Sequence, residues 1–209
     1  PEGIIKSAKI SLIDGEIDRI FHNLPSPDYD DIGFIPRDSL QSDLRKKIAG
    51  RHPVITVLGD GGDGKTSIAL QCLHEMVSAN DHPFDGIVWV SAKSNRLGIK
   101  EIERIEGSIL DSMDLFRSVS NVFGDDAPDP LERVWQLLES NKILLVIDNL
   151  ETILDVSIKK FAENVPGESK ILFTSRVPLG SDLTVKIGPF SSSESLKMLR
   201  ALATSYNVV

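Results

Sequence analysis

One run of eight residues constrains this chain more than any other feature. The segment GDGGDGKT, from Gly59 to Thr66, fits the pattern G-x-x-x-x-G-K-[ST] without a mismatch. It follows a short β-branched run at Val54–Leu58 and precedes a helical apolar pattern that extends to about Ala79. A strand, a glycine loop and a helix in this order predict a loop whose backbone N–H groups converge on phosphate oxygens. The alternative, a glycine turn without a ligand, is disfavoured by both flanks.

The residue types in this loop have separate roles. Lys65 brings a positive charge toward the β- and γ-phosphates, and the Thr66 hydroxyl can ligate Mg²⁺. The helix that begins near Gly64 adds the partial positive charge of its N-terminus. Asp60 and Asp63 would repel a polyphosphate, so we expect both to point outward. The predicted nucleotide-binding residues of the loop are Gly59, Asp60, Gly61, Gly62, Asp63, Gly64, Lys65, Thr66 and Ser67.

Two later strands end in polar residues that complete the predicted site. The strand in ILLVIDN delivers Asp148 to its carboxyl end, where ligands bind in open α/β sheets, and Asp148 there would hold Mg²⁺ through water. The strand in SKILFTSR places Arg176 similarly, where a guanidinium can contact the γ-phosphate and distinguish a triphosphate from a diphosphate. The alternative for Arg176 is a surface arginine before a turn. We therefore predict Lys65, Asp148 and Arg176 as catalytic residues, and Thr66 and Asp148 as metal ligands.

The residues after Asp148 predict slow hydrolysis of ATP. Asn149 stands where many hydrolytic relatives place a second carboxylate, and an amide cannot accept a proton as a base. Glu151 is an acidic candidate, although a carboxylate in the first turn of a helix explains it equally well. ATP is favoured over GTP because the guanine-reading pattern N-K-x-D is absent: Asn141-Lys142 is followed by Ile and Leu.

Apolar strands alternate with helical patterns along most of the chain, which predicts an α/β fold with a parallel sheet covered on both faces. Besides Val54–Leu58, the predicted strands are Gly86–Ala92, Ile143–Ile147, Lys170–Thr174 and Leu183–Ile187. Helices are predicted for Leu40–Ile48 with Asp38 as N-cap and Gly50 as stop, for Ile99–Phe116, from Pro130, and from about Ser193.

The N-terminal region lacks the alternation of strands and helices that is predicted for the rest of the chain. Apolar spacing favours a helix over Ile10–Leu24, with a hairpin turning at Asp14-Gly15 as the alternative. The proline- and aspartate-rich stretch Leu24–Pro36 is typical of a linker. We therefore expect a helical segment and linker over 1–32 and a nucleotide-binding domain over 33–209, with its core at 53–190.

Composition excludes several classes of partner. The chain has 23 basic and 31 acidic residues, a net charge of −8, so a chain-wide electrostatic hold on nucleic acid or an anionic membrane is disfavoured. The longest apolar runs are far shorter than the roughly 20 residues that span a bilayer. The single Cys72 allows no internal disulfide, which favours the cytoplasm, and it lies on an apolar helical stripe typical of a core residue. The four histidines show no zinc-ligand spacing.

Four motifs together resemble the nucleotide-binding core of signal-transduction ATPases with numerous domains (STAND), especially the NB-ARC branch. They are GDGGDGKTSIALQCL, FDGIVWVSA, LLVIDNLE and SKILFTSR, and the upstream GFIPRDSLQSDLRKKI matches the segment that packs near the adenine in that family. The resemblance implies adenine contacts for Ile35 and Arg37, although Pro36 stands where a glycine usually precedes the arginine. It also implies a P-loop NTPase three-layer α/β/α sandwich of ASCE type, with Lys170–Thr174 inserted between the strands that end in Gly59 and Asp148.

The same resemblance implies a molecular switch that is closed with ADP and open or homo-oligomeric with ATP. We expect helical and winged-helix modules to follow Val209, and effector and sensor domains to flank this one in a longer chain. Family members act in immunity, antiphage defence, cell death and transcriptional control. Two alternatives remain open at this point: an AAA+-type ATPase acting on nucleic acid (or a phosphotransferase), and an interaction scaffold locked to ADP without turnover.

Overall fold

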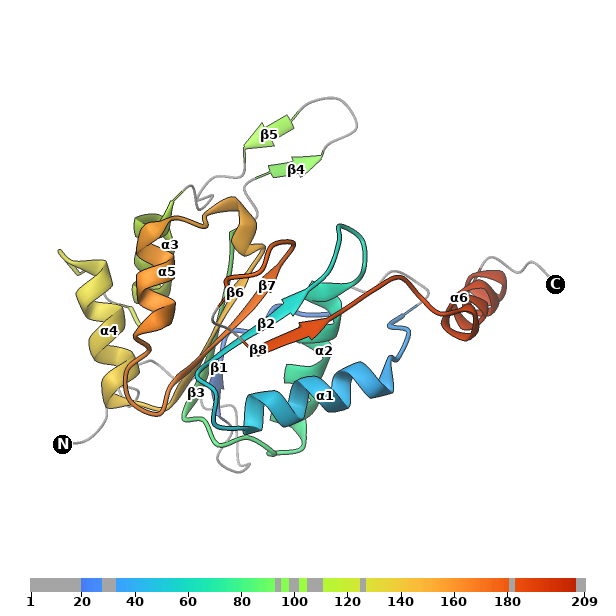
Figure 1. The fold of residues 1–209 in the computed structure, drawn as a ribbon, viewed down its shortest axis with the longest axis horizontal. Coiled ribbons are helices and arrows are strands. Elements are labelled where there is room, and N and C mark those ends of the chain that lie inside the picture. The colour runs from blue at the N-terminus through green and yellow to red at the C-terminus, as the bar shows by residue number, and fades with distance from the viewer. Residues whose placement is uncertain are drawn as a thin grey trace.

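A parallel β-sheet forms the centre of the fold (Figure 1). The computed structural model describes residues 20–27, 33–92, 95–97, 102–104, 111–124, 127–180 and 183–205. Within these residues the sheet has six strands in the order β1-β3-β6-β7-β2-β8, and every pair is parallel. The strands are β1 (Phe21–His22), β2 (Val54–Leu58), β3 (Gly86–Ser91), β6 (Ile143–Asp148), β7 (Lys170–Ser175) and β8 (Leu183–Lys186). Strand β7 lies between β6 and β2, as the resemblance implied.

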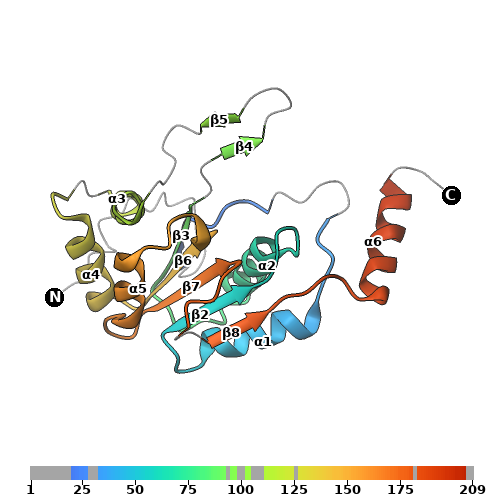
Figure 2. The same ribbon diagram turned by 45° about the horizontal axis from the view of Figure 1, so that its top comes forward.

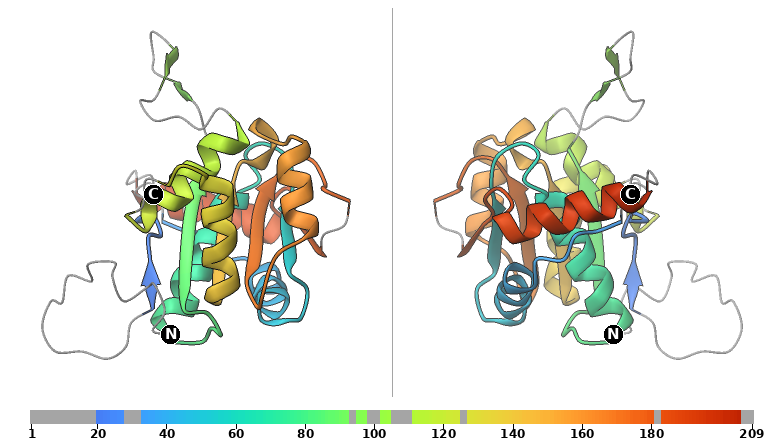
Figure 3. Two further views of the ribbon diagram at one scale, coloured as in Figure 1. Left: turned by 90° about the vertical axis from the view of Figure 1, so that its left-hand side faces the viewer. Right: turned by 90° about the vertical axis from the view of Figure 1, so that its right-hand side faces the viewer.

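Helices cover both faces of this sheet and give the expected three-layer α/β/α sandwich (Figure 3). Helices α1 (Asp38–Ala49) and α2 (Lys65–Ser78) pack on one face, and α3 (Ser112–Val122), α4 (Pro130–Ser140) and α5 (Val156–Glu163) pack on the other. Successive strand residues face opposite sides: Leu144 and Val146 join the first core, and Leu145 and Ile147 the second. Burial on both sides explains why the strand sequences are almost wholly apolar.

Helix α6 (Ser192–Ser205) follows β8 and stands apart from the sheet (Figure 2). No residue of α6 is buried, and Leu196 and Leu199 are exposed. No helix in the described part of the chain is both long enough and apolar enough to cross a membrane.

The long helix predicted for Ile99–Phe116 is wrong at its start. Strands β4 (Asn95–Leu97) and β5 (Ile102–Arg104) form a separate antiparallel pair, and α3 begins only at Ser112. The isoleucines of this segment match a helical spacing, but β-branched residues also favour extended backbone. The helix begins where Asp111 accepts a hydrogen bond from the Asp114 backbone N–H. The rest of the predicted helix between 99 and 110 lies outside the described residues.

The helix predicted for Ile10–Leu24 is also wrong where the structure describes it. Phe21–His22 form β1, which pairs in parallel with Gly86 and Ile87 of β3. The Asn23 side chain fixes this edge strand, because its amide donates to the Trp89 carbonyl at 2.9 Å and its oxygen accepts from the Trp89 N–H at 2.6 Å. The residues before 20, including the alternative hairpin at Asp14-Gly15, lie outside the described residues.

The start of α1 differs in detail from its prediction. Asp38 is the first helical residue rather than the N-cap, which is Arg37. The Gln41 side chain accepts a hydrogen bond from the Arg37 backbone N–H at 3.0 Å, so a residue inside the helix supplies the capping contact. Two other helix boundaries agree with the prediction: α4 begins at Pro130, and Gly50 ends α1. Cys72 is buried in the core as expected, and burial raises the pKa of its thiol to about 11.

Candidate nucleotide-binding site

The glycine loop connects β2 to α2 at the carboxyl end of the sheet. Gly62 and Gly64 have φ angles of 90° and 84°, in the left-handed region that favours glycine. Lys65 is largely buried, and its Nζ donates to the Asp60 carbonyl at 2.8 Å. The side chain of Lys65 therefore folds back onto the glycine loop.

The two aspartates of the loop differ from each other. Asp60 is exposed, as expected of an outward side chain, whereas Asp63 is only half-buried and engages the loop itself. The Asp63 Oδ2 accepts a hydrogen bond from the Asp60 backbone N–H at 2.8 Å. The expectation that Asp63 points outward is therefore wrong, because its carboxylate satisfies an N–H at the start of the loop.

The structure brings Thr66 and Asp148 together, although 82 residues separate them in the chain. The Thr66 hydroxyl donates to Asp148 Oδ1 at 2.7 Å, at the point where α2 begins and β6 ends. Asp148 is only 3% exposed, so its carboxylate depends on neighbouring donors rather than on water. These are the two residues that the sequence predicts as metal ligands.

Three further donors surround the Asp148 carboxylate. The Thr174 hydroxyl donates to Oδ1 at 2.6 Å, and the Ser91 hydroxyl and Asn149 side-chain amide donate to Oδ2 at 3.0 and 2.8 Å. Each carboxylate oxygen thus accepts two hydrogen bonds, counting that from Thr66. We call Asp148 with Thr66, Ser91, Asn149 and Thr174 the aspartate corner.

Sequence reasoning assigned no role to Ser91 or Thr174, although a usable signal was present. Each is a hydroxyl residue at or near the carboxyl end of a strand that neighbours β6, so each lies level with Asp148. Asn149 has a left-handed backbone with φ 60°, and its backbone N–H donates to the Thr174 Oγ1 at 3.0 Å. The side-chain amide of Asn149, which donates to Asp148 Oδ2, therefore helps to orient the Asp148 carboxylate.

Arg176 and Glu151 form a second group beside the loop. The Arg176 Nε pairs with Glu151 Oε1 at 3.1 Å, and the Arg176 backbone N–H donates to Glu151 Oε2 at 3.2 Å. A Cβ placed on Gly61 would lie 3.2 Å from the guanidinium carbon of Arg176. The structure thus brings Arg176 next to the glycine loop. We call Arg176, Glu151 and Gly61 the arginine corner.

The segment that the resemblance placed near the adenine is bound to the connection between β8 and α6. The Arg37 guanidinium is 8% exposed and donates to the carbonyls of Gly188 and Pro189 and to the Glu194 carboxylate. It also lies 5.2 Å from the centre of the Phe190 ring. Arg37 therefore attaches the β8–α6 connection to the start of α1, and Ile35 beside it is half-buried.

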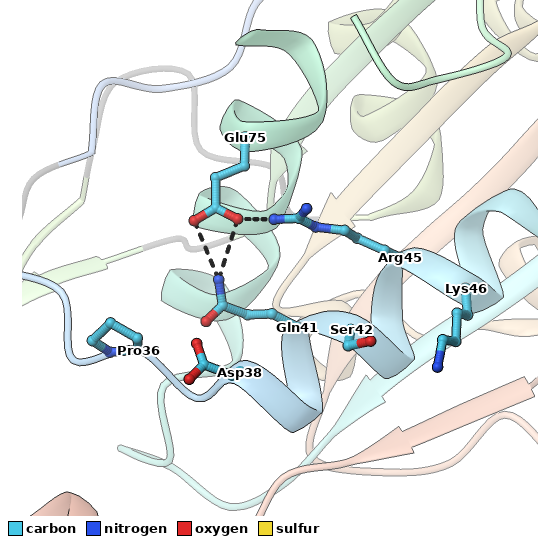
Figure 4. Close-up of a pocket in the computed structure, with 7 residues that line it drawn as sticks. All are labelled: Pro36, Asp38, Gln41, Ser42, Arg45, Lys46 and Glu75. Atoms are coloured by element: carbon cyan, nitrogen blue, oxygen red, sulfur yellow. Dashed lines mark hydrogen bonds and ion pairs between the residues drawn. The ribbon is translucent and has the colours of Figure 1, made fainter. Parts of the chain in front are cut away.

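A cavity of about 400 Å³ opens between α1 and α2 (Figure 4). Glu75 of α2 points into it and bonds to both Gln41 and Arg45 of α1. Glu75 lies ten residues after Lys65, about 15 Å along the helix, so this cavity is at the far end of α2 from the loop. It is lined by Pro36, Asp38, Gln41, Ser42, Arg45, Lys46 and Glu75.

Comparison with known proteins identifies the family to which this site belongs. Residues 37–200 match the model of the NB-ARC domain. The chain belongs to the NB-ARC domain family. It is thereby a nucleotide-binding P-loop NTPase domain of the STAND class, and the loop, the aspartate corner and Arg176 all fall inside the matched range.

Individual relatives add context to this NB-ARC domain. It is 27% identical over 170 residues to the transcription activator GutR of Bacillus subtilis (strain 168), covering 75% of this chain and 18% of GutR. A crystal structure of a DNA replication initiation factor matches with a TM-score of 0.52 and 14% identity, over 88% of this chain and 56% of that one, and so shares the fold. A STAND protein with a tetratricopeptide repeat sensor from Pyrococcus horikoshii matches with a TM-score of 0.49 and 14% identity, over 82% of this chain and 26% of that one. The chain thus spans a fifth to about half of these proteins.

Proposed function

We propose that this NB-ARC domain is the ATP/ADP-binding switch module of a larger signalling protein and that it hydrolyses ATP slowly with Mg²⁺. The contact between Thr66 and Asp148 carries the proposal, because it joins the phosphate loop to the carboxylate of a distant strand. Lys65 and the loop amides would bind the phosphates, Thr66 and Asp148 would hold the metal, and Arg176 would read the γ-phosphate.

The aspartate corner suits Mg²⁺. A hydroxyl and a carboxylate are hard oxygen ligands, and Mg²⁺ is usually held by one or two such groups together with substrate phosphates. The four donors to Asp148 orient its carboxylate before any ligand binds. When bound, Mg²⁺ supplies charge neutralisation for the β- and γ-phosphate oxygens.

The local chemistry supports slow turnover. Asn149 stands next to Asp148 and its amide is bonded to that carboxylate, so no base is available from this position. Glu151 is paired with Arg176, which leaves it occupied as well. A slow hydrolytic step is the property that a switch with two long-lived states requires.

The match to GutR supports a role in transcriptional control within a longer cytoplasmic protein. In this proposal, effector and sensor domains flank the module, and ATP binding favours an open, self-associating form. Roles in immunity, antiphage defence or cell death are the alternatives that the family offers.

Lys65→Ala gives the most direct test of the phosphate-loop assignment. Removing a buried, charge-assisted contact to phosphate should weaken binding of both ATP and ADP by about 100-fold in calorimetry with Mg²⁺. Lys159→Ala, on the exposed side of α5, is the matched control and should bind like the unmodified chain. Equal affinity of the Lys65 variant and the unmodified chain would reject the assignment.

Phosphate release distinguishes the remaining functions. A slow switch should release phosphate above background without DNA, whereas an ATPase acting on nucleic acid should be accelerated by added DNA. The shared fold with a replication initiation factor favours testing DNA, although the net charge of −8 argues against a direct contact by this domain. Release at background level would favour a scaffold locked to ADP, which the occupied Asn149 also allows.

A further inference from the structure

Glu151 binds Arg176 at two points that are far apart along the arginine side chain. One carboxylate oxygen pairs with Nε and the other accepts from the backbone N–H of the same residue. A single carboxylate therefore closes a ring that includes the backbone and most of the side chain of Arg176. Such a ring restricts the rotamers of a side chain that is otherwise 59% exposed.

The turn that carries Glu151 is itself fixed. Glu151 lies in the short 3₁₀ helix η2 (Leu150–Thr152), directly after the left-handed Asn149. On one side of Glu151, Leu150 is fully buried, and on the other the Thr152 hydroxyl donates to the Ala92 carbonyl at 2.9 Å. Glu151 is accordingly held in place by its neighbours, while its own side chain is 18% exposed.

The clamp leaves the end of the guanidinium available. Within the described residues, the Arg176 nitrogens Nη1 and Nη2 donate to no protein group. They face Gly61, where an added Cβ would lie 3.3 Å from Nη2 and 3.5 Å from Nη1. Two nitrogens with four N–H groups thus lie against the phosphate loop, and a guanidinium end of this kind suits bidentate binding to a phosphoryl group.

We infer that Glu151 is a positioning residue for nucleotide discrimination: it holds Arg176 so that the terminal nitrogens meet the third phosphate of ATP. The inference rests on the proposed function, in which Arg176 reads the γ-phosphate. Glu151 itself does not touch the nucleotide. Its effect is to remove the conformational freedom that Arg176 would otherwise lose on binding ATP.

Glu151→Gln separates this role from a purely structural one. Glutamine has one acceptor oxygen, so it can accept from Nε or from the backbone N–H of Arg176, but not from both in the same way. We expect about fivefold weaker binding of a non-hydrolysable ATP analogue, because the loss of entropy on ordering one long side chain weakens binding by about this factor. Binding of ADP should be unchanged. The effect should vanish when Arg176→Ala is also present, because Glu151 acts only through that arginine.

Glu168→Gln is the matched control. Glu168 pairs with Lys142 at 2.8 Å at the opposite end of β6 and β7, so its loss removes a comparable exposed ion pair far from the loop. It should leave both affinities unchanged. Thermal unfolding of each variant confirms that the fold is retained, which is expected because Glu151 and Arg176 are both partly exposed.

The outcomes separate the inference from the proposed function. An equal loss of ATP-analogue and ADP affinity in Glu151→Gln, no loss, or a loss that persists beside Arg176→Ala would overturn the positioning role alone. If Arg176→Ala leaves the preference for the ATP analogue unchanged, both the role of Glu151 and the γ-phosphate role of Arg176 are overturned. If the unmodified chain binds neither nucleotide, the proposed function fails with them.

Discussion

The aspartate corner and the arginine corner lie at the same edge of the sheet but are built in opposite ways. Asp148 is 3% exposed and accepts four hydrogen bonds from neutral donors, whereas Arg176 is 59% exposed and has one carboxylate partner. A buried carboxylate must be satisfied by the protein, so its geometry is fixed during folding. A partly exposed ion pair contributes little to stability, and it leaves the end of the Arg176 guanidinium open to a ligand.

This difference suggests a division of labour between the two corners. In the proposed function, the aspartate corner would hold the metal in every nucleotide state, and its hydrogen bonds fix its geometry. The arginine corner would then distinguish ATP from ADP, and the end of its guanidinium is exposed. Substitutions should therefore affect stability and metal dependence at the first corner and nucleotide preference at the second.

Asp148→Asn should have the largest effect and would test the first half of this comparison. The substitution keeps the shape of the side chain but removes the charged oxygen ligand, so Mg²⁺ should no longer strengthen ATP binding. Phosphate release should fall by about 100-fold or more. Asp129→Asn is the control: Asp129 caps α4, and asparagine is an equally good N-cap. An unchanged Mg²⁺ titration in Asp148→Asn would show that this carboxylate is not the metal ligand.

Thr174→Val should cost about 1–3 kcal/mol in the free energy of unfolding, measured with denaturant. The substitution is nearly isosteric, but it removes a donor to Asp148 and the acceptor for the Asn149 backbone N–H in a fully buried position. The measured loss of stability would show how much the aspartate corner depends on these hydrogen bonds.

Thr56→Val provides the matched control on the adjacent strand. Thr56 is also fully buried, and within the described residues its hydroxyl has no hydrogen-bond partner. Replacing it should therefore stabilise the fold by up to about 1 kcal/mol. If both threonine variants lose stability equally, the loss comes from packing. The hydrogen bonds to Asp148 would then not be what fixes the aspartate corner.

Some parts of the site were predictable from sequence, because each is marked by a continuous stretch of residues. The loop from Gly59 to Thr66 is one motif, and Asp148 and Arg176 each follow an apolar strand. A parallel sheet brings the carboxyl ends of its strands to one edge, so their proximity to the loop followed from the fold class. The confirmed order with β7 beside β2 came from the family resemblance rather than from spacing.

The contacts that the sequence did not predict are those without a local pattern. Ser91 reaches Asp148 from a strand 57 residues earlier, and the pairing of β1 with β3 depends on Asn23 and Trp89, which are 66 residues apart. The pairing of Glu151 with Arg176 depends on the left-handed turn at Asn149, which no periodicity indicates. Strand β5 was missed because isoleucine spacing was considered without its preference for extended backbone.

Gly61→Ala should have the smallest effect, and it tests whether the arginine corner acts separately from the rest of the phosphate loop. The φ of Gly61 is not in the left-handed region, so alanine fits the backbone, but its Cβ would press on the flexible end of Arg176 at 3.2 Å. We expect a change below about 0.5 kcal/mol in the free energy of unfolding. The preference for an ATP analogue over ADP should fall about twofold, because the terminal nitrogens move by a few tenths of an ångström.

Gly62→Ala is the informative counterpart, since it changes the same loop for a different reason. A Cβ on Gly62 meets no atom within 4 Å, but the φ of 90° strains an alanine and should cost about 1–2 kcal/mol. It should weaken ATP and ADP binding alike, because it distorts the loop without touching Arg176. If Gly61→Ala also weakened both nucleotides equally, the arginine corner would be part of the common phosphate site and the two corners would not divide their work.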